Sequence, residues 1–303
     1  MRKQLKIKKI IPLLLVALIS LGLFANSFLF KGREGILFKP LQQNTTLAWP
    51  GNGDAAIGSM EEGLLARSSK IEKLRPMASM AKVITALAIL EKQPFNAGQE
   101  GQTYTVTKKD VETLRAYLSE GGSTLPILIG MKLTQYQGLQ RMLIASDNNT
   151  ADLLVERVFG SKGLYLSYAR DMLKRLGLTQ TVVTDASGFD AGTASTPSEL
   201  IRIGIAALKN PVIARIVVQR EARLPVVGVI KNTNQLLGSL GVIGIKTGTT
   251  SEAGSCLLFA AKGTNREGKK TTIVAVIMGD SNHSRLYKDA RELLASAKKG
   301  YNL

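Results

Sequence analysis

Residue types on which many enzyme mechanisms depend are almost absent from this sequence. Its 303 residues include one cysteine, Cys256, and one histidine, His283. A single cysteine excludes an internal disulfide and a metal site built from thiolates. A histidine-based zinc site or a Ser-His-Asp triad would depend on His283 alone, so nucleophilic chemistry in this chain needs another base. Aromatic residues make up only 5% of the chain. Since neither a zinc-finger spacing nor a glycine-rich RNA motif occurs, nucleic acid is not an expected partner.

Acidic residues are also scarce relative to basic ones. Lys and Arg number 40 against 23 Asp and Glu, which gives a formal net charge of +17. Such a balance indicates an anionic neighbour, such as membrane lipid or wall polymer, or simply a solvated basic surface. Hydrophobic residues form 45% of the chain. That content is enough for one large domain or two small ones.

The first thirty residues combine a basic start with an uncharged apolar run. Residues 1–9 carry five Lys and Arg side chains, and residues 10–30 carry no charge. A run of that length can cross a bilayer as a helix, and the preceding lysines favour the cytoplasmic side. We therefore expect residues 1–30 to be an uncleaved anchor in the cell membrane, with the rest of the chain extracytoplasmic. A cleaved signal peptide ending at Ala25 is the alternative, and both interpretations export the protein.

The remaining chain predicts a linker over residues 31–53 and one folded domain over 54–303. Hydrophobic patterns and turn residues predict helices in the middle of the domain and strands at both of its ends. The fold class is therefore α+β (an α/β sandwich), an antiparallel sheet of about five strands from both chain ends, flanked by helices, with an all-helical lobe. The predicted strands are 55–59, 63–68, 223–230, 241–249, 255–262 and 271–279. One helix is predicted to begin at Ser79. Residues 137–158 are predicted to form two helical stretches that meet near Ser146. The other predicted helices are 164–176, 198–208 and 285–299.

A buried helix that begins with a lysine is the first chemical signal. The pattern S-x-x-K occurs at Ser79 and Lys82, ahead of an apolar run that predicts burial. Residues i and i+3 share a helix face, so the amine can contact the hydroxyl. Burial and the positive helix N-terminus lower a lysine pKa, and a neutral lysine can then take the serine proton. The same pattern at Ser296 and Lys299 lies in a polar helix and is interpreted as a solvated face.

Two further motifs occur once each. S-x-N stands at Ser146 and Asn148, where the hydroxyl could pass a proton and the amide could hold a carbonyl, although the tripeptide is also typical of a helix N-cap. K-T-G follows an apolar strand at Lys246, Thr247 and Gly248, with Thr249 after it. A glycine there permits close approach of a ligand to the strand, and strand N–H groups could face an oxyanion. An ordinary strand end is the alternative interpretation of K-T-G.

Taken together and in this order, S-x-x-K, S-D-N and K-T-G are the signature of penicillin-binding proteins and serine β-lactamases. The chain resembles that superfamily from about Ala55 to its C-terminus, and specifically the low-molecular-mass D-alanyl-D-alanine carboxypeptidases. The stretches A-S-G-F at 186–189, A-S-T-P-S-E-L at 194–200, N-T-N-Q-L-L at 232–237 and A-G-S-C-L at 253–257 are also similar to family segments.

The resemblance implies a serine β-lactamase/DD-peptidase-like fold and a role for each motif residue. Ser79 would be the acylated nucleophile, Lys82 its base and Ser146 a proton shuttle. Backbone N–H groups of Ser79 and Thr249 would form the oxyanion hole. The implied substrate-binding residues are Asn148, Lys246, Thr247, Gly248 and Thr249, with Arg285 as a weaker candidate for the substrate carboxylate.

The same resemblance implies the reaction and the partners. A peptidoglycan stem peptide would lose its terminal D-alanine through an acyl-enzyme on Ser79, β-lactam antibiotics would be covalent inhibitors, and neither a metal nor another cofactor is expected. The N-terminal segment would supply membrane attachment, since neither the small C-terminal β domain nor the amphipathic membrane helix of many relatives is expected here.

The sequence departs from this family pattern at one position. Asp147 stands where these carboxypeptidases more often have Gly or Ala. An Asp at this position of the motif is typical of class A β-lactamases. Their deacylating E-x-x-L-N loop has only a poor match here, from Glu221 to Pro225. A class A-like β-lactamase, a DD-endopeptidase and an inactive membrane-tethered wall-binding protein remain the alternatives.

Overall fold

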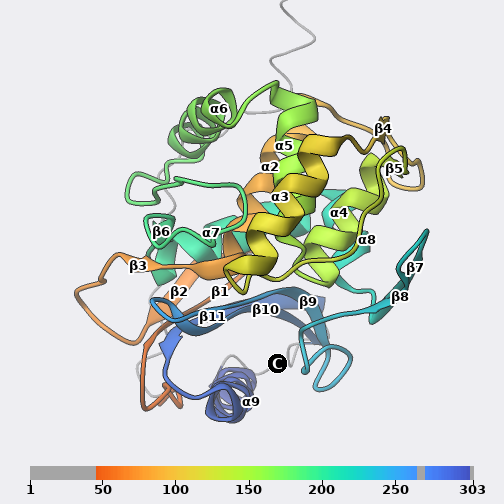
Figure 1. Ribbon diagram of the computed structural model, residues 1–303. Coiled ribbons are helices and arrows are strands. Elements are labelled where there is room, and N and C mark those ends of the chain that lie inside the picture. Colours follow the sequence, from red (N-terminus) through yellow and green to blue (C-terminus); the bar gives the residue numbers. More distant parts are fainter. Residues whose placement is uncertain (1–45, 265–269, 301–303) are drawn as a thin grey trace, which may run out of the picture. The chain divides into compact units, whose positions relative to one another are not determined.

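Apolar runs from both ends of the chain form one antiparallel sheet in the computed structural model (Figure 1). The structure describes residues 46–264 and 270–300. The strand order is β2-β1-β11-β10-β9, so the two N-terminal strands complete a sheet begun by the last three, as predicted. The strands are β1 (Asp54–Ser59), β2 (Gly63–Arg67), β9 (Val242–Thr250), β10 (Gly254–Thr264) and β11 (Lys270–Asp280).

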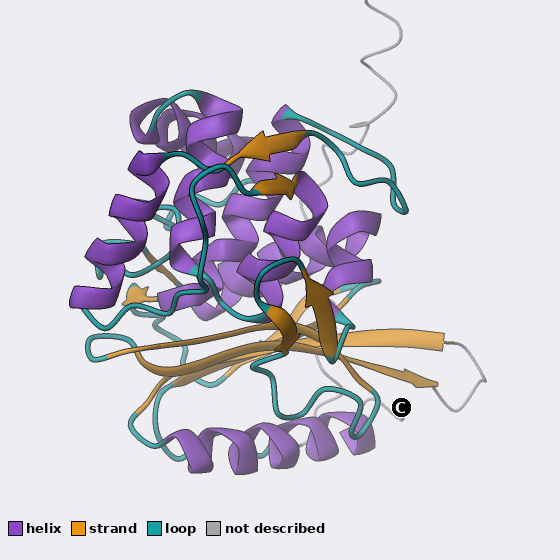
Figure 2. Cartoon of the chain, turned by 45° about the vertical axis from the view of Figure 1, so that its right-hand side comes forward, coloured by secondary structure: helices purple, strands orange, loops and turns teal. Residues whose placement is uncertain are grey.

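Helices cover both faces of this sheet, which explains why β10 and β11 are apolar almost throughout. The terminal helix α9 (His283–Gly300) packs on one face and the helical lobe on the other (Figure 2). On the α9 side, Phe259 and Ile277 are buried with Leu293. Residues 46–53, predicted as linker, lie against α9: the Ala48 amide donates to Ser296 Oγ over 2.9 Å.

The helical lobe lies between β2 and β9 in the sequence. Side chains at several helix starts accept backbone hydrogen bonds, among them Thr134, Ser161, Thr196 and Asn210. These caps satisfy amides that have no partner within their own helix. The helices are α2 (Ala81–Lys92), α3 (Lys108–Ser119), α4 (Gln135–Ile144), α5 (Asn148–Phe159), α6 (Lys162–Arg175), α7 (Pro197–Lys209) and α8 (Pro211–Val217).

One strand prediction was wrong, and several elements were not predicted. The strand predicted at 223–230 is a separate hairpin, β7 (Glu221–Leu224) and β8 (Gly228–Lys231), because Pro225 and Val226 form a turn in its middle. Helices α3 and α8 were not predicted; Asn210 ends α7 and also caps α8. The remaining short strands form two small pairs, β3 (Arg75–Pro76) with β6 (Ala194–Ser195) and β4 (Thr103–Thr105) with β5 (Lys132–Thr134).

The predicted membrane segment, residues 1–30, lies outside the described residues. Within 46–264 and 270–300, no helix combines the length and the apolar character that a bilayer crossing requires.

Candidate active site

The first and third motifs meet because strand β9 packs directly on the turn that carries Ser79. That turn is a 3₁₀ helix, η1 (Ala78–Met80), which directly precedes α2, so Ser79 lies two residues before the α-helix that was predicted to begin at it. A Cβ built on Gly248 would lie 2.9 Å from the Ser79 nitrogen and 2.9 Å from the Ala78 Cβ. Only glycine permits this approach, as the sequence predicts for the K-T-G strand.

Lys82 is the centre of the site. Its side chain is completely buried. Its Nζ lies 2.7 Å from Ser79 Oγ, 2.7 Å from Asn148 Oδ1 and 2.8 Å from the Ser187 carbonyl oxygen. The structure thus brings the first and second motifs together around one amine, with Ser79 itself partly exposed.

The surroundings of this amine favour its neutral form. Burial lowers the pKa of Lys82 from 10.5 to about 7, and the carboxylates of Asp185, Asp147 and Asp152 only partly oppose that shift. The amide oxygen of Asn148 and the Ser187 carbonyl can only accept hydrogen bonds. When the amine is neutral, its two N–H groups can donate to these two oxygens, which leaves its lone pair for the Ser79 hydroxyl. The Lys82 amine, with a pKa of about 7, can therefore act as a base toward the Ser79 hydroxyl.

The Ser187 carbonyl is a site group that the sequence did not identify. A buried carboxylate, Asp185, shapes its loop: Oδ2 accepts from the Ser187 amide over 3.1 Å, the Ser187 hydroxyl over 2.7 Å and the Phe189 amide over 2.9 Å. Gly188 adopts φ +73°, and a Cβ there would collide with the Ala78 carbonyl. The signal was present in D-A-S-G-F, since an Asp followed by Ser-Gly is typical of an organised turn.

Of the second motif, Asn148 contacts Lys82 and Ser146 does not. Ser146 lies between α4 and α5 with φ +66°, a left-handed conformation that is uncommon for serine. Its side chain is nearly buried. Within the described residues, the Ser146 hydroxyl has no hydrogen-bond partner, so it is free to bond to a bound substrate.

The third motif supplies a second buried lysine. Lys246 Nζ donates to the Thr247 carbonyl over 2.9 Å. Burial, together with the charge of Lys82, lowers the pKa of Lys246 well below 10.5. The Thr247 hydroxyl bonds to that of Thr233 at 2.6 Å, and the Thr233 amide donates to Ile144 at the end of α4. Thr233 thereby joins K-T-G to the end of α4, two residues before Ser146, a link that sequence spacing does not predict.

The remaining candidates, Thr249 and Arg285, form no hydrogen bond to Ser79 or Lys82 among the described residues. Thr249 is exposed near the end of β9, an edge strand, and Arg285 donates to Asp280 over 3.4 Å and to Ser281 over 2.9 Å. No contact in the described chain joins Arg285 to Ser79 or Lys82. Glu221, the rival deacylating residue, is exposed on β7 opposite Lys231.

The carboxyl group of Asp147 does not face the nucleophile. It is fully buried against Arg141, with 2.8 Å between Arg141 Nε and Asp147 Oδ2. Burial raises the pKa of Asp147, while the guanidinium of Arg141 and hydrogen bonds from Thr150 and Leu125 oppose that shift. The described residues contain no cluster of three His, Cys, Asp or Glu side chains that could hold a metal ion. The site instead pairs a serine hydroxyl with a buried lysine amine 2.7 Å away, an arrangement that can support nucleophilic chemistry.

The chain is similar to known proteins in sequence and in fold. A family model described as D-alanyl-D-alanine carboxypeptidase matches residues 59–282. The D-alanyl-D-alanine carboxypeptidase DacF of Bacillus subtilis is 31% identical over 216 residues, 69% of this chain and 52% of that protein. A D-alanyl-D-alanine endopeptidase of Pseudomonas aeruginosa is 23% identical over 229 residues, 73% of this chain and 68% of that protein. The crystal structure of a D-alanyl-D-alanine carboxypeptidase from Mycobacterium tuberculosis has a TM-score of 0.73 at 25% identity, covering 86% of this chain and 96% of that one.

Proposed function

Because the chain belongs to the D-alanyl-D-alanine carboxypeptidase family, we propose that it removes the terminal D-alanine of peptidoglycan stem peptides through an acyl-enzyme on Ser79. The observation that carries this proposal is the environment of Lys82. Its Nζ lies 2.7 Å from Ser79 Oγ, and Asn148 and Ser187 occupy its other two hydrogen-bonding directions. A serine hydroxyl is a weak nucleophile until a positioned base takes its proton.

Acylation then proceeds by addition and elimination. The Ser79 proton moves to Lys82 Nζ while Oγ forms a bond to the carbonyl carbon between the two D-alanines. Backbone N–H groups of Ser79 and Thr249 would stabilise the oxyanion. When the C–N bond breaks, the leaving amine takes the proton that Lys82 accepted. The Ser146 hydroxyl, which has no competing partner in the described chain and no bond to Lys82 without substrate, would relay it in the substrate complex.

Deacylation reverses these roles. A water molecule loses a proton to Lys82 as its oxygen attacks the acyl carbon, and the bond to Ser79 Oγ breaks. Oγ recovers a proton, and the shortened peptide leaves as a carboxylate. Base and acid are the same lysine, and a pKa of about 7 suits both tasks near neutral pH.

The edge of the sheet would orient the substrate. Strand β9 has no neighbour on its outer side among the described strands. An extended peptide can pair with such an edge through main-chain hydrogen bonds. The terminal carboxylate of the substrate would then lie near Lys246 and Thr249, where its charge favours the ammonium form of Lys246, with Arg285 as a further candidate. Asn148 would hold a substrate amide while it holds Lys82.

A β-lactam carries a reactive amide in place of the dipeptide bond and is proposed to acylate the same serine. The location that best suits this substrate is the outer face of the cell membrane, with residues 1–30 as the anchor. An endopeptidase is the second candidate, since the Pseudomonas aeruginosa relative carries that name. It would use the same residues and differ only in the leaving group.

The proposal is tested by intact-protein mass after incubation with benzylpenicillin, followed by assays of free D-alanine and of crosslinked stem peptides. We expect an increase of one drug mass in the wild type and in Ser296→Ala, which alters the second S-x-x-K, and no increase in Ser79→Ala. Release of D-alanine from a pentapeptide supports the carboxypeptidase. Cleavage of crosslinked peptides alone would favour the endopeptidase. Absence of any adduct would overturn both, and rapid adduct loss with accumulating hydrolysed drug would indicate a β-lactamase.

A further inference from the structure

Asp147 belongs to the S-D-N motif but has no role in the proposed reaction, and its contacts indicate a different task. The carboxylate does not cap α5, although the residue occupies the N-cap position. Its Oδ2 accepts from Arg141 Nε over 2.8 Å and from Thr150 Oγ over 2.5 Å, and its Oδ1 accepts from the Leu125 amide over 3.1 Å. Asp147 therefore ties the S-D-N link to the loop that leads from α3 to β5.

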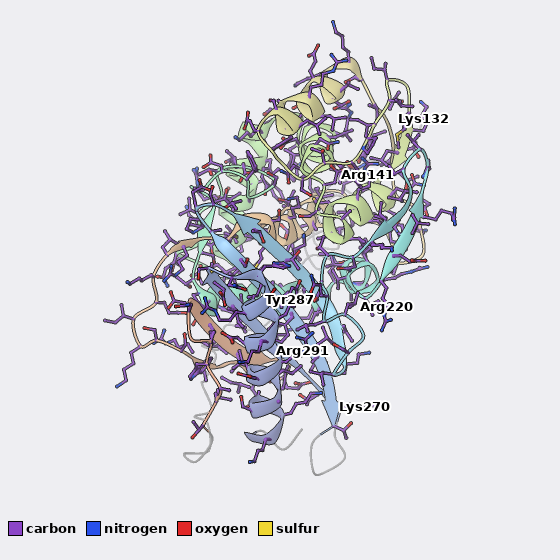
Figure 3. All side chains as sticks on the ribbon, turned by 60° about the horizontal axis from the view of Figure 1, so that its bottom comes forward. Lys132, Arg141, Arg220, Lys270, Tyr287 and Arg291 are labelled. Atoms are coloured by element: carbon purple, nitrogen blue, oxygen red, sulfur yellow. The ribbon has the colours of Figure 1, made fainter. Side chains whose placement is uncertain are left out.

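Arg141 holds the same loop from its other side. It lies on α4 inside the helical lobe (Figure 3), with no exposed surface. Its Nη2 donates to the carbonyls of Leu125, over 2.9 Å, and Pro126, over 3.1 Å. Its own carbonyl accepts the amides of Ala145 and Asp147, each over 3.2 Å. One residue thus fixes both the loop and the link that contains Ser146.

The loop in turn contacts a substrate-binding residue. The Ser123 carbonyl accepts the Asn148 amide over 2.8 Å, at the first residue of α5. A Cβ on Gly122 would lie 3.0 Å from Asn148 Nδ2. The chain of contacts therefore runs from Arg141 and Asp147 through residues 122–126 to Asn148, which itself accepts from Lys82 over 2.7 Å.

We propose that the buried Arg141–Asp147 pair is a positioning device of the active site, which locks residues 123–126 against the S-D-N link. The lock sets the orientation of Asn148 toward Lys82 and maintains the strained backbone of Ser146. A left-handed conformation at a residue other than glycine persists only where its surroundings determine it. Here the hydrogen bonds of the Ala145 and Asp147 amides to the Arg141 carbonyl hold the backbone on either side of Ser146. This inference rests on the proposed acylation of Ser79.

A purely stabilising ion pair is the competing interpretation. Buried pairs are weak evidence for stability, because desolvation of two charges offsets much of their attraction. The two interpretations differ in what happens to molecules that remain folded. A stabilising pair changes only how many molecules fold, whereas a positioning pair changes how fast each folded molecule reacts.

The experiment measures the second-order rate of acylation by a fluorescent penicillin, per folded molecule, for Asp147→Ala and Asp147→Asn. The control is Asp110→Ala, which breaks another largely buried pair, Arg157–Asp110, that joins α3 to α5. We expect Asp147→Ala to acylate about 10- to 100-fold more slowly, as misplaced catalytic groups do. Asp147→Asn keeps an acceptor for the loop and should recover part of that loss. Asp110→Ala should lower the melting temperature and leave the rate unchanged.

The outcomes separate this inference from the function on which it rests. If the wild type forms no adduct, the proposed function fails. If the wild type reacts and folded Asp147→Ala reacts equally fast, the positioning role is wrong. Should Asp147→Ala fail to fold, Asp147→Asn and Arg141→Met decide the question: wild-type rates in both folded proteins would also overturn the inference.

Discussion

Burial of Lys82, which lowers its pKa, costs folding free energy, and that cost disappears at high pH. In the folded protein the pKa of Lys82 is about 7, whereas in the unfolded chain it returns to 10.5. Between these values the unfolded chain holds one more proton, so stability rises with pH across this window and is constant below it. Replacing Lys82 by Met removes this dependence, although it also removes the hydrogen bonds to Ser79, Asn148 and Ser187.

The lost hydrogen bonds do not depend on pH, so the pH dependence isolates the ionisation cost. Each pH unit in which only the unfolded chain holds the proton contributes about 1.36 kcal/mol. From about pH 7 to about pH 9.5, the wild type should therefore gain about 3 kcal/mol of unfolding free energy relative to Lys82→Met. The neighbouring Lys246 acts in the same direction, since loss of the Lys82 charge lets Lys246 keep its proton to higher pH in the variant.

The assay is urea unfolding of wild type and Lys82→Met at several pH values, followed by circular dichroism. Lys299→Met is the matched control, because Lys299 belongs to the second S-x-x-K and is exposed. We expect the free-energy difference between wild type and Lys82→Met to change by about 3 kcal/mol over this range. The Lys299→Met difference should stay constant. A difference for Lys82→Met that does not vary with pH would show that the buried lysine keeps its proton, and the mechanism would lose its base.

Two further outcomes follow from the same geometry. The acylation rate constant should rise as pH increases through about 7, because Lys82 must be neutral to accept the Ser79 proton. Stopped-flow fluorescence with a reporter penicillin measures it, and a flat profile contradicts it. Gly248→Ala should slow acylation about 100-fold, because its Cβ would lie 2.9 Å from the Ser79 nitrogen. Gly51→Ala, where the added Cβ has no neighbour within 4 Å, is the control, and equal rates in the two variants would refute the argument.

The sequence predicts the sheet well because each of its strands is marked by local apolar patterning and by turn residues at its ends. Strands β9, β10 and β11 are long apolar runs that end at turn residues, and both of their faces are buried. The hairpin β7–β8 was misread as one strand since Val226 and Val227 continue the apolar run through a turn. Helix α3 escaped prediction because its sequence is largely polar and only Asp110 and Leu114 are buried. Patterning identifies elements with a strong apolar face and misses those without one.

Some contacts of the site can be predicted from residues close in the sequence, and others depend on residues far apart in the sequence. Ser79 and Lys82 are three residues apart, so their contact follows from helix geometry. The Ser187 carbonyl is 105 positions from Lys82, and its approach depends on how the loop around Asp185 folds back on α2. A carbonyl oxygen exists in every residue, so no residue type marks this one. Backbone groups of a site are thus the part that a sequence reveals least.

The two copies of S-x-x-K show what the surroundings add to a motif. In the second copy, Ser296 Oγ donates to the Leu293 carbonyl over 2.8 Å and accepts the Ala48 amide, so both of its roles are structural. Lys299 is exposed and its charge remains hydrated. In the first copy the lysine has lost its water, and the two other groups that contact its nitrogen can only accept hydrogen bonds. The Ser79 hydroxyl is therefore the one partner that can donate to the amine. Burial and the identity of these acceptors, rather than the four-residue spacing, make a base of Lys82 and leave Lys299 a solvated cation.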